Sequence, residues 1–177
     1  MSLGLYEGSV PVFLRYLDRL AQLIRTAQSF AARSGLAPDE LLRARLWPDM
    51  LPFEKQVAIA ANFTLRTCFP LTGQAIPPAG DIAAGFDGLL ALVEHTASLL
   101  RSLEPARFIG SHLRVLESRA GDAMVSLRAS EFLLHYALPN FFFHLGAAYA
   151  ILRSRGVPLG KADFDGFHAY PATRASF

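Results

Sequence analysis

Four long segments of the chain carry apolar residues at every third or fourth position, the spacing of a helix with one buried face. They predict helices over residues 9–34, 52–69, 81–103 and 139–155. Proline near the start of the first segment and glycine after its end agree with the usual preferences of helix termini. Because four such faces bury one another in a bundle, the sequence predicts an all-α fold, an up-down four-helix bundle.

Two shorter elements are expected between the long helices. A short helix should cover 37–46. Between His112 and Arg128 the apolar spacing changes to two, with Gly121 and Asp122 in the middle. Alternation around a turn of this kind is typical of strand pairs, so we expect a small β-hairpin inserted before the last helix.

Proline and glycine also divide the C-terminal part of the chain. A helical region should start at Ser130, and Pro139 should break it, because proline lacks the N–H that a helix interior needs. After Gly156, further prolines and glycines are expected to prevent regular structure. We therefore predict one domain over 1–166 and a loose C-terminal tail over 167–177.

The composition favours a well-filled core and excludes some classes of function. Apolar residues make up 52% of the 177 residues and charged residues 18%, which suggests leftover apolar surface covered by a second copy in a homodimer. The 17 basic and 15 acidic side chains are scattered, with a formal net charge of +2. Without a basic block to neutralise a phosphate backbone, nucleic-acid binding is not expected.

The sequence also indicates a location in the cell. The single cysteine, Cys68, cannot form a disulfide within the chain, and Met1 to Pro11 has no charged-then-apolar leader. Charged residues or histidine interrupt every apolar stretch before it reaches the roughly 18–20 residues needed to cross a bilayer. We expect a cytoplasmic protein that does not enter the membrane.

The candidate site lies in the apolar stretch 130–156, which contains three polar side chains: His135, Asn140 and His144. Asn140 and His144 are four residues apart, so they leave the same helix face about one turn apart. A buried amide or imidazole without a partner costs roughly 1–3 kcal/mol, so such groups need hydrogen bonds or a function. Two structural alternatives stay open: Asn140 satisfies N–H groups at a helix start, and His135 is a core residue.

Four further residues complete the pocket candidates. Gln56 is expected inside the second long helix, and His144 has the alternative of a hydrogen bond to Gln56 or to a backbone carbonyl. Asp49 stands just before that helix, where it can equally anchor a turn. Trp47 and Tyr136 can wall a pocket, although large aromatic residues near prolines also simply pack.

Two stretches resemble the signature sequences of an uncharacterised bacterial family with a domain of unknown function. They are WPDMLPFEKQVAIA at 47–60 and FLLHYALPNFFFHLGAAYAILRSRGVPLGKADF at 132–164, and the opening YEGSVP at 6–11 fits as well. The pattern L-P-N-F-x-F-H is a specific part of the match. This family is similar in fold to the DinB/YfiT-like superfamily of four-helix proteins, some of which are metalloenzymes or thiol-dependent S-transferases or isomerases.

The resemblance implies a metal site that is altered here. In metal-binding members, a histidine from the second helix joins an H-x-x-x-H pair on the last helix to hold a divalent ion. The matching positions are Gln56, Asn140 and His144. Amides bind zinc poorly, since that ion selects thiolate, imidazole and carboxylate ligands. The site is thus expected to be degenerate, with His144 and His135 as the only candidate ligands and a divalent metal doubtful.

Two hypotheses for the function follow. The first is a small-molecule-binding or structural dimer that kept the bundle and lost the metal chemistry. The alternative is a metal- or thiol-dependent enzyme of the transferase or isomerase type, with an interhelical pocket around His144. Convergence of His135, His144 and Asp49 within ligand distance would favour the enzyme, whereas mutual hydrogen bonds among Gln56, Asn140 and His144 with no cavity would favour a structural role.

Overall fold

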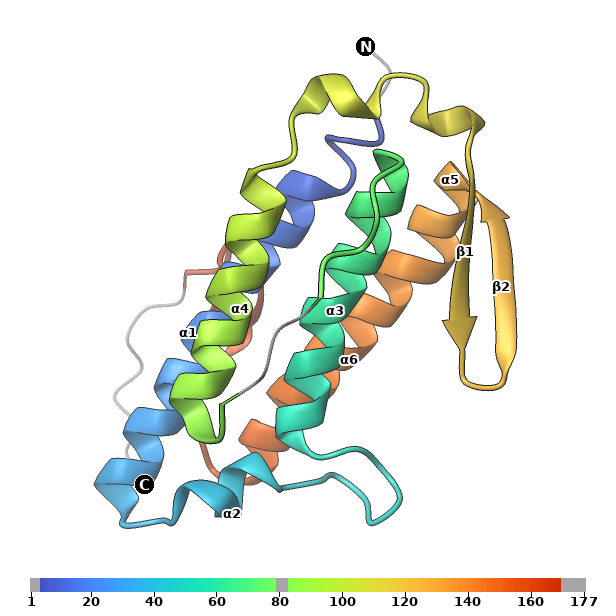
Figure 1. Ribbon diagram of the computed structural model, residues 1–177. Helices are drawn as coiled ribbons and strands as arrows, with labels where there is room; N and C mark the ends of the chain where they lie inside the picture. The colour runs from blue at the N-terminus through green and yellow to red at the C-terminus, as the bar shows by residue number, and fades with distance from the viewer. Residues whose placement is uncertain (1–3, 79–82, 170–177) are drawn as a thin grey trace.

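The computed structural model describes residues 4–78 and 83–169. Within these ranges the α-helices are α1 (Val10–Ser34), α2 (Pro38–Leu42), α3 (Phe53–Leu71), α4 (Gly85–Arg101), α5 (Ala129–Glu131), α6 (Leu138–Ser154) and α7 (Lys161–Asp165). The 3-10 turns η1 (Pro105–Phe108) and η2 (Ser111–Leu113) and the π-helical turn η3 (Phe132–Ala137) join them. The strands are β1 (Val115–Ala120) and β2 (Ala123–Arg128). The expectation of a mostly helical fold with a hairpin before the last long helix is confirmed (Figure 1).

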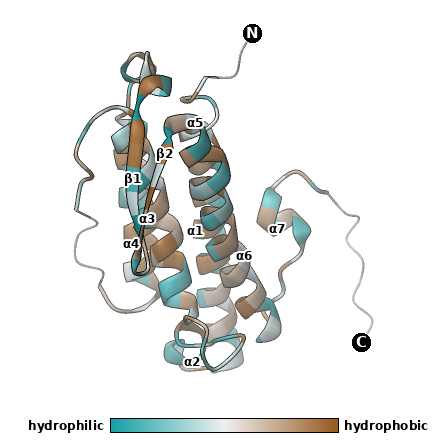
Figure 2. Ribbon diagram, turned by 90° about the vertical axis from the view of Figure 1, so that its right-hand side faces the viewer, coloured by the Kyte–Doolittle hydropathy of each residue, from teal (hydrophilic) through white to brown (hydrophobic). Residues whose placement is uncertain are grey.

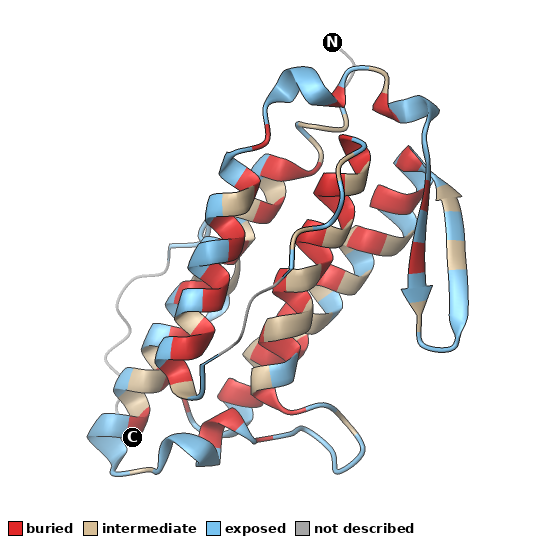
Figure 3. Ribbon diagram, in the orientation of Figure 1, coloured by how far each residue is buried: buried red, intermediate tan, exposed pale blue. Residues whose placement is uncertain are grey.

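The long helices pack side by side around one apolar core. α1 contacts α4, α3 contacts both α4 and α6, and the buried residues of these helices face one another (Figure 3). Among the largest fully buried side chains are Phe13, Phe53, Phe132 and Phe141. The described residues form seven α-helices: four long ones, the short α2 and α5, which lie where short helical regions were expected, and α7, which was not expected.

The helix ends follow the local sequence. α1 has Pro11 in its first turn and ends before Gly35, whose φ of 65° is the left-handed conformation that glycine adopts most readily. α3 continues through Pro70 to Leu71, slightly beyond the expected end. The expected start of the third long helix, at position 81, lies outside the described residues, and α4 begins at Gly85.

The expected break at Pro139 is wrong, since α5, η3 and α6 follow one another without interruption. Proline in a helix removes one hydrogen bond, and its ring clashes with the carbonyl four residues earlier. Here the wider π-helical turn lies directly before α6, and Nδ2 of Asn140 donates to the backbone oxygen of Tyr136 at 2.7 Å. The chain therefore stays helical on both sides of the proline.

The expectation of no regular structure after Gly156 is also wrong, because α7 forms there. The carboxylate of Asp163 accepts a hydrogen bond from the backbone N–H of Gly160 at 2.7 Å, which satisfies one N–H at the helix start. The ring of Phe164 lies 6.2 Å from Tyr16 of α1 and 5.7 Å from Tyr149 of α6. These contacts hold α7 against the long helices, away from the hairpin (Figure 2).

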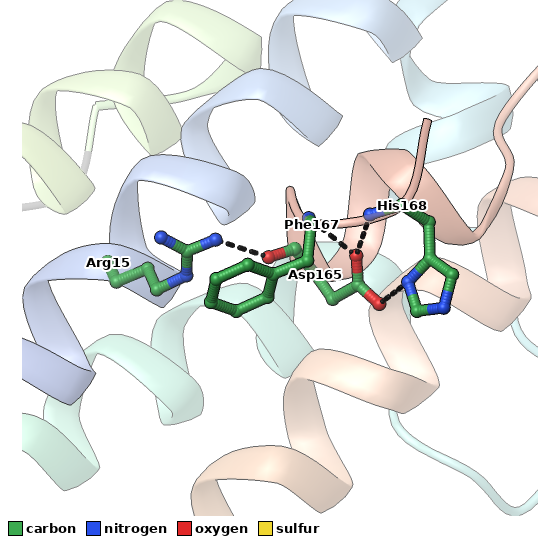
Figure 4. A network of polar contacts seen from close by, with 4 residues as sticks. All are labelled: Arg15, Asp165, Phe167 and His168. Carbon is green, nitrogen blue, oxygen red and sulfur yellow. Dashed lines mark hydrogen bonds and ion pairs between the residues drawn. The ribbon is translucent and has the colours of Figure 1, made fainter. Parts of the chain in front are cut away.

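The residues directly after α7 contact α1. Arg15 donates to the backbone oxygen of Asp165 at 2.9 Å, and its guanidinium lies 3.6 Å from the ring centre of Phe167 (Figure 4). Asp165 accepts hydrogen bonds from the backbone of Phe167 and from the ring of His168. The pKa of Asp165 is lowered, first by the Phe167 N–H and also by His168.

The hairpin is attached to α3 and to η3. Its strands pair antiparallel, with Ala120 opposite Ala123 across the predicted turn. Arg66 of α3 donates to the hydroxyl of Ser118 and, at 2.6 Å, to the backbone oxygen of Arg119. No helix in the described parts of the chain is long and apolar enough to cross a membrane.

Candidate functional site

Gln56 and His144 form the polar contact between α3 and α6. Nδ1 of His144 lies 2.7 Å from Oε1 of Gln56, and Nε2 of Gln56 donates to the backbone oxygen of Leu51 at 3.1 Å. Gln56 is only 2% exposed. Both polar ends of this buried amide are thus satisfied, one by the segment just before its own helix and one by α6.

Aromatic rings surround the imidazole. The ring of Phe63 stacks on His144 with centres 5.9 Å apart and planes inclined by 24°, and the ring of Phe143 meets it edge-on at 5.2 Å. Burial against these apolar neighbours lowers the pKa of His144 below its ordinary value of 6.5. At neutral pH the imidazole is therefore uncharged.

The second ring nitrogen of His144 is available to a ligand. Within residues 4–78 and 83–169, the hydrogen bond to Gln56 is the only one that the His144 side chain makes, and it uses Nδ1. The ring is half-buried, and among the described residues no buried side-chain nitrogen lacks a hydrogen-bond partner, so the unbonded Nε2 is accessible. The neighbouring Phe143 is 60% exposed. An imidazole held at one nitrogen and accessible at the other can accept or donate one hydrogen bond.

Asn140 and Tyr136 lie on the same helical rod as His144 but serve other contacts. The Asn140 side chain binds the backbone oxygen of Tyr136, as described above, rather than His144. The hydroxyl of Tyr136 donates to the backbone oxygen of Arg119 at 3.4 Å, and its ring lies 5.7 Å from Phe63. Tyr136 thus connects the hairpin with the aromatic neighbours of His144.

The structure does not bring the other pocket candidates to this pair. Asp49 and His135 are exposed, and Trp47 is 67% exposed. No described hydrogen bond, ion pair or ring contact joins any of the three to Gln56 or His144. Of the two arrangements expected from the sequence, the described residues therefore show the Gln56–His144 hydrogen bond and not a cluster of His135, His144 and Asp49.

The residues present do not fit a divalent metal ion. No group of three His, Cys, Asp or Glu side chains in the described part of the chain could hold one. The amide oxygen of Gln56 already lies in a hydrogen bond with His144, and the amide of Asn140 is committed to Tyr136. A single imidazole is a poor site for an ion that selects four ligands.

Two further residues belong to the site, and the sequence carries a signal for each. Phe63 follows Gln56 by seven residues, two helical turns on the same face of α3. Phe143 belongs to a run of three phenylalanines that covers almost a full helix circumference, so one of them must face away from the core. Phe141 is fully buried, Phe142 packs on Tyr16, and Phe143 is the exposed member.

Cys68 takes no part in the site. Its side chain is fully buried in α3, and burial raises its pKa far above the ordinary thiol value, although a hydrogen bond with Ser9 acts in the opposite direction. The thiolate is the nucleophilic form of cysteine, so this thiol is unreactive in the folded protein.

The fold and the site define a mostly helical, DinB-like protein with a hairpin before its last long helix and an amide–imidazole pair between two helices. The structure is similar to the crystal structure of a DinB family member protein from Shewanella denitrificans, with a TM-score of 0.82, 29% sequence identity and coverage of 96% of each chain. No curated protein matches the sequence. The chain belongs to the family described as Domain of unknown function (DUF1993), whose model matches residues 5–165.

Proposed function

We propose that this chain is a four-helix protein of the DinB type that binds a small molecule at the Gln56–His144 pair without a metal ion. The observation that carries the proposal is the hydrogen bond between the buried Gln56 amide and His144, which leaves one ring nitrogen available at the surface. Small-molecule sites combine aromatic walls with a few polar groups of fixed orientation. Phe63, Phe143 and the imidazole supply both.

The donor set supports binding rather than metal chemistry. At the three positions that the resemblance assigns to metal ligands, two are amides, and both amides already make hydrogen bonds within the protein. Amides and a neutral imidazole recognise polar molecules by donating and accepting hydrogen bonds. The ancestral metal site is thus proposed to have become a hydrogen-bonding site.

A screen of small molecules by thermal shift tests this function. Compounds that bind at the pair should raise the melting temperature of the parent and of His135→Ala, whose histidine is exposed, but not that of His144→Ala. A compound that stabilises all three proteins equally binds elsewhere. If no compound of a broad fragment set distinguishes His144→Ala from the other two, the proposal fails.

Elemental analysis of protein purified without an affinity tag tests the absence of a metal. The expected result is no stoichiometric zinc, nickel or iron in the parent or in His144→Ala. A near-stoichiometric metal in the parent that is lost in His144→Ala would overturn the metal-free assignment and favour the metal-dependent enzyme.

We also propose that the chain forms a homodimer. Large apolar side chains on its surface support this, among them Trp47 at 67%, Phe143 at 60% and Leu134 at 56% exposure. Exposed apolar patches commonly mark contacts between proteins. The expected interface includes Trp47.

A further inference from the structure

The hydrogen bonds of Gln56 determine which nitrogen of His144 carries the proton. The backbone oxygen of Leu51 can only accept, so the part of Gln56 that faces it is the NH₂ group. The amide oxygen is thereby turned toward Nδ1 of His144, 2.7 Å away. Two acceptors do not approach so closely without a hydrogen atom between them, so Nδ1 is the donor.

The surroundings keep this arrangement from reversing. Gln56 is 2% exposed, so its amide has no water to bind if it turns away from Leu51. The rings of Phe63 and Phe143 contact the imidazole and limit its rotation. Burial also lowers the pKa of His144, so the ring is neutral at pH 7. A neutral imidazole with a proton on Nδ1 has a lone pair on Nε2.

We propose that Gln56 fixes His144 as the neutral Nδ1–H tautomer, and that Nε2 accepts a hydrogen bond from a ligand carrying an alcohol, thiol or N–H group beside an apolar body. This inference rests on the proposed function and names the class of its ligand. The exposed ring of Phe143 contacts the apolar body. A carboxylate or phosphate is excluded as the group facing Nε2, since a lone pair repels an anion. Gln56 is a positioning residue that acts through His144.

The tautomer is tested directly by ¹⁵N NMR of the imidazole nitrogens in the full chain at pH 7. His144→Gln assigns the signals, and the exposed His95, His112 and His135 serve as references. The expected spectrum shows a protonated Nδ1 and an unprotonated Nε2 for His144. A proton on Nε2, or an imidazolium at pH 7, would overturn the inference without deciding whether the pair binds a ligand.

Variants of Gln56 separate positioning from a purely structural role. Gln56→Leu removes the acceptor, so the His144 signals should move toward the Nε2–H form. Gln56→Glu keeps an acceptor, so it should preserve the Nδ1–H form and raise the pKa of His144, because the carboxylate favours the charged ring. An unchanged tautomer in Gln56→Leu would overturn the role of Gln56. If that variant does not fold, an unchanged His144 pKa in Gln56→Glu would overturn it instead.

The ligand class is tested with three ring compounds of similar size. Phenol has a donor, anisole lacks it, and benzoate carries an anionic group. Titration of the ¹⁵N-labelled protein should show phenol shifting the Nε2 signal and binding about fivefold more tightly than anisole, the factor expected of one neutral hydrogen bond. Benzoate should not shift it. Equal binding of phenol and anisole, or preferred binding of benzoate, would overturn the ligand class.

The outcomes distinguish this inference from the proposed function. If none of the three compounds shifts His144 while the fragment screen finds ligands that need it, the donor class is wrong and the binding function stands. If neither the compounds nor the screen gives a His144-dependent effect, the proposed function fails, and only the tautomer assignment survives.

Discussion

His144 links the stability of the protein to pH. Its pKa is lower in the folded state than the ordinary 6.5, because burial disfavours the charged ring. As the pH falls below about 6.5, the unfolded state takes up this proton first, so the folded state loses stability until the pH passes the folded pKa. The free energy of unfolding from urea titrations at pH 5 to 8 should therefore fall on the acid side in the parent.

The variant His144→Gln removes this proton site and should flatten that part of the profile. Asp165 does not affect the profile between pH 5 and 8, because its pKa lies below its ordinary value of 3.8. Its contribution to the free energy of unfolding is lost only at lower pH. A parent and a variant with the same slope between pH 5 and 6.5 would show that His144 does not carry this dependence.

At the scale of single residues, the sequence predicted part of the site. The Gln56–His144 hydrogen bond was one of two alternatives for His144, because the resemblance assigns both residues to the positions of one metal site. The positions of His135 and Asn140 could not be predicted in the same way. The π-helical turn changes the angle between successive residues before α6. The spacing of apolar residues in the sequence does not predict such a turn.

Among the elements, two glycines provide a matched test of backbone conformation. Gly35 ends α1 with φ at 65°, and a methyl group there would meet nothing within 4 Å. Gly35→Ala should thus cost about 1 kcal/mol through the left-handed backbone alone. Gly146 also has open space around an added methyl but lies inside α6 without a positive φ. Gly146→Ala should stabilise by roughly 0.5–1 kcal/mol.

Urea unfolding of both variants measures these differences. Because neither added methyl group meets a neighbour, the two changes in the free energy of unfolding depend on backbone conformation and should have opposite signs. A destabilised Gly146→Ala protein would mean that this position contacts something the isolated chain lacks.

The hairpin depends on few contacts with the helices, and Arg66 makes two of them. Arg66→Ala should raise amide hydrogen exchange in β1 and β2 roughly tenfold, the effect of losing one or two hydrogen bonds, while exchange in α1 stays unchanged. Arg128→Ala, an exposed arginine on β2, is the control. Equal exchange in both variants would show that Arg66 does not hold the hairpin.

How far the sequence predicted each element depended on its length. α1 was predicted closely, because seven turns repeat the same apolar spacing and Gly35 marks the end. α7 has five residues and depends on contacts with Tyr16 and Tyr149, which are distant in sequence. The helix through Pro139 was missed because it continues from a π-helical turn, and the apolar spacing of the sequence does not indicate such a turn.

For the whole molecule, we propose that the exposed Trp47 lies in a dimer interface. Sedimentation velocity should show a dimer for the parent and a shift toward monomer for Trp47→Ser, since the variant loses an apolar contact at the interface. Phe167→Ser is the control, because Phe167 is also exposed but lies against Arg15 of α1. A monomeric parent at all concentrations, or an equal effect of both variants, would contradict the proposed interface.

The only thiol of the chain belongs to Cys68, fully buried in α3. A reagent that modifies thiols can reach it only when the surrounding helices separate. The rate of labelling therefore measures how often the core opens. In an excess of reagent this rate should be slow in native buffer and rise steeply with urea. The rate of Cys68 modification therefore reports the rate at which the core opens. The same measurement can be applied to every variant described above.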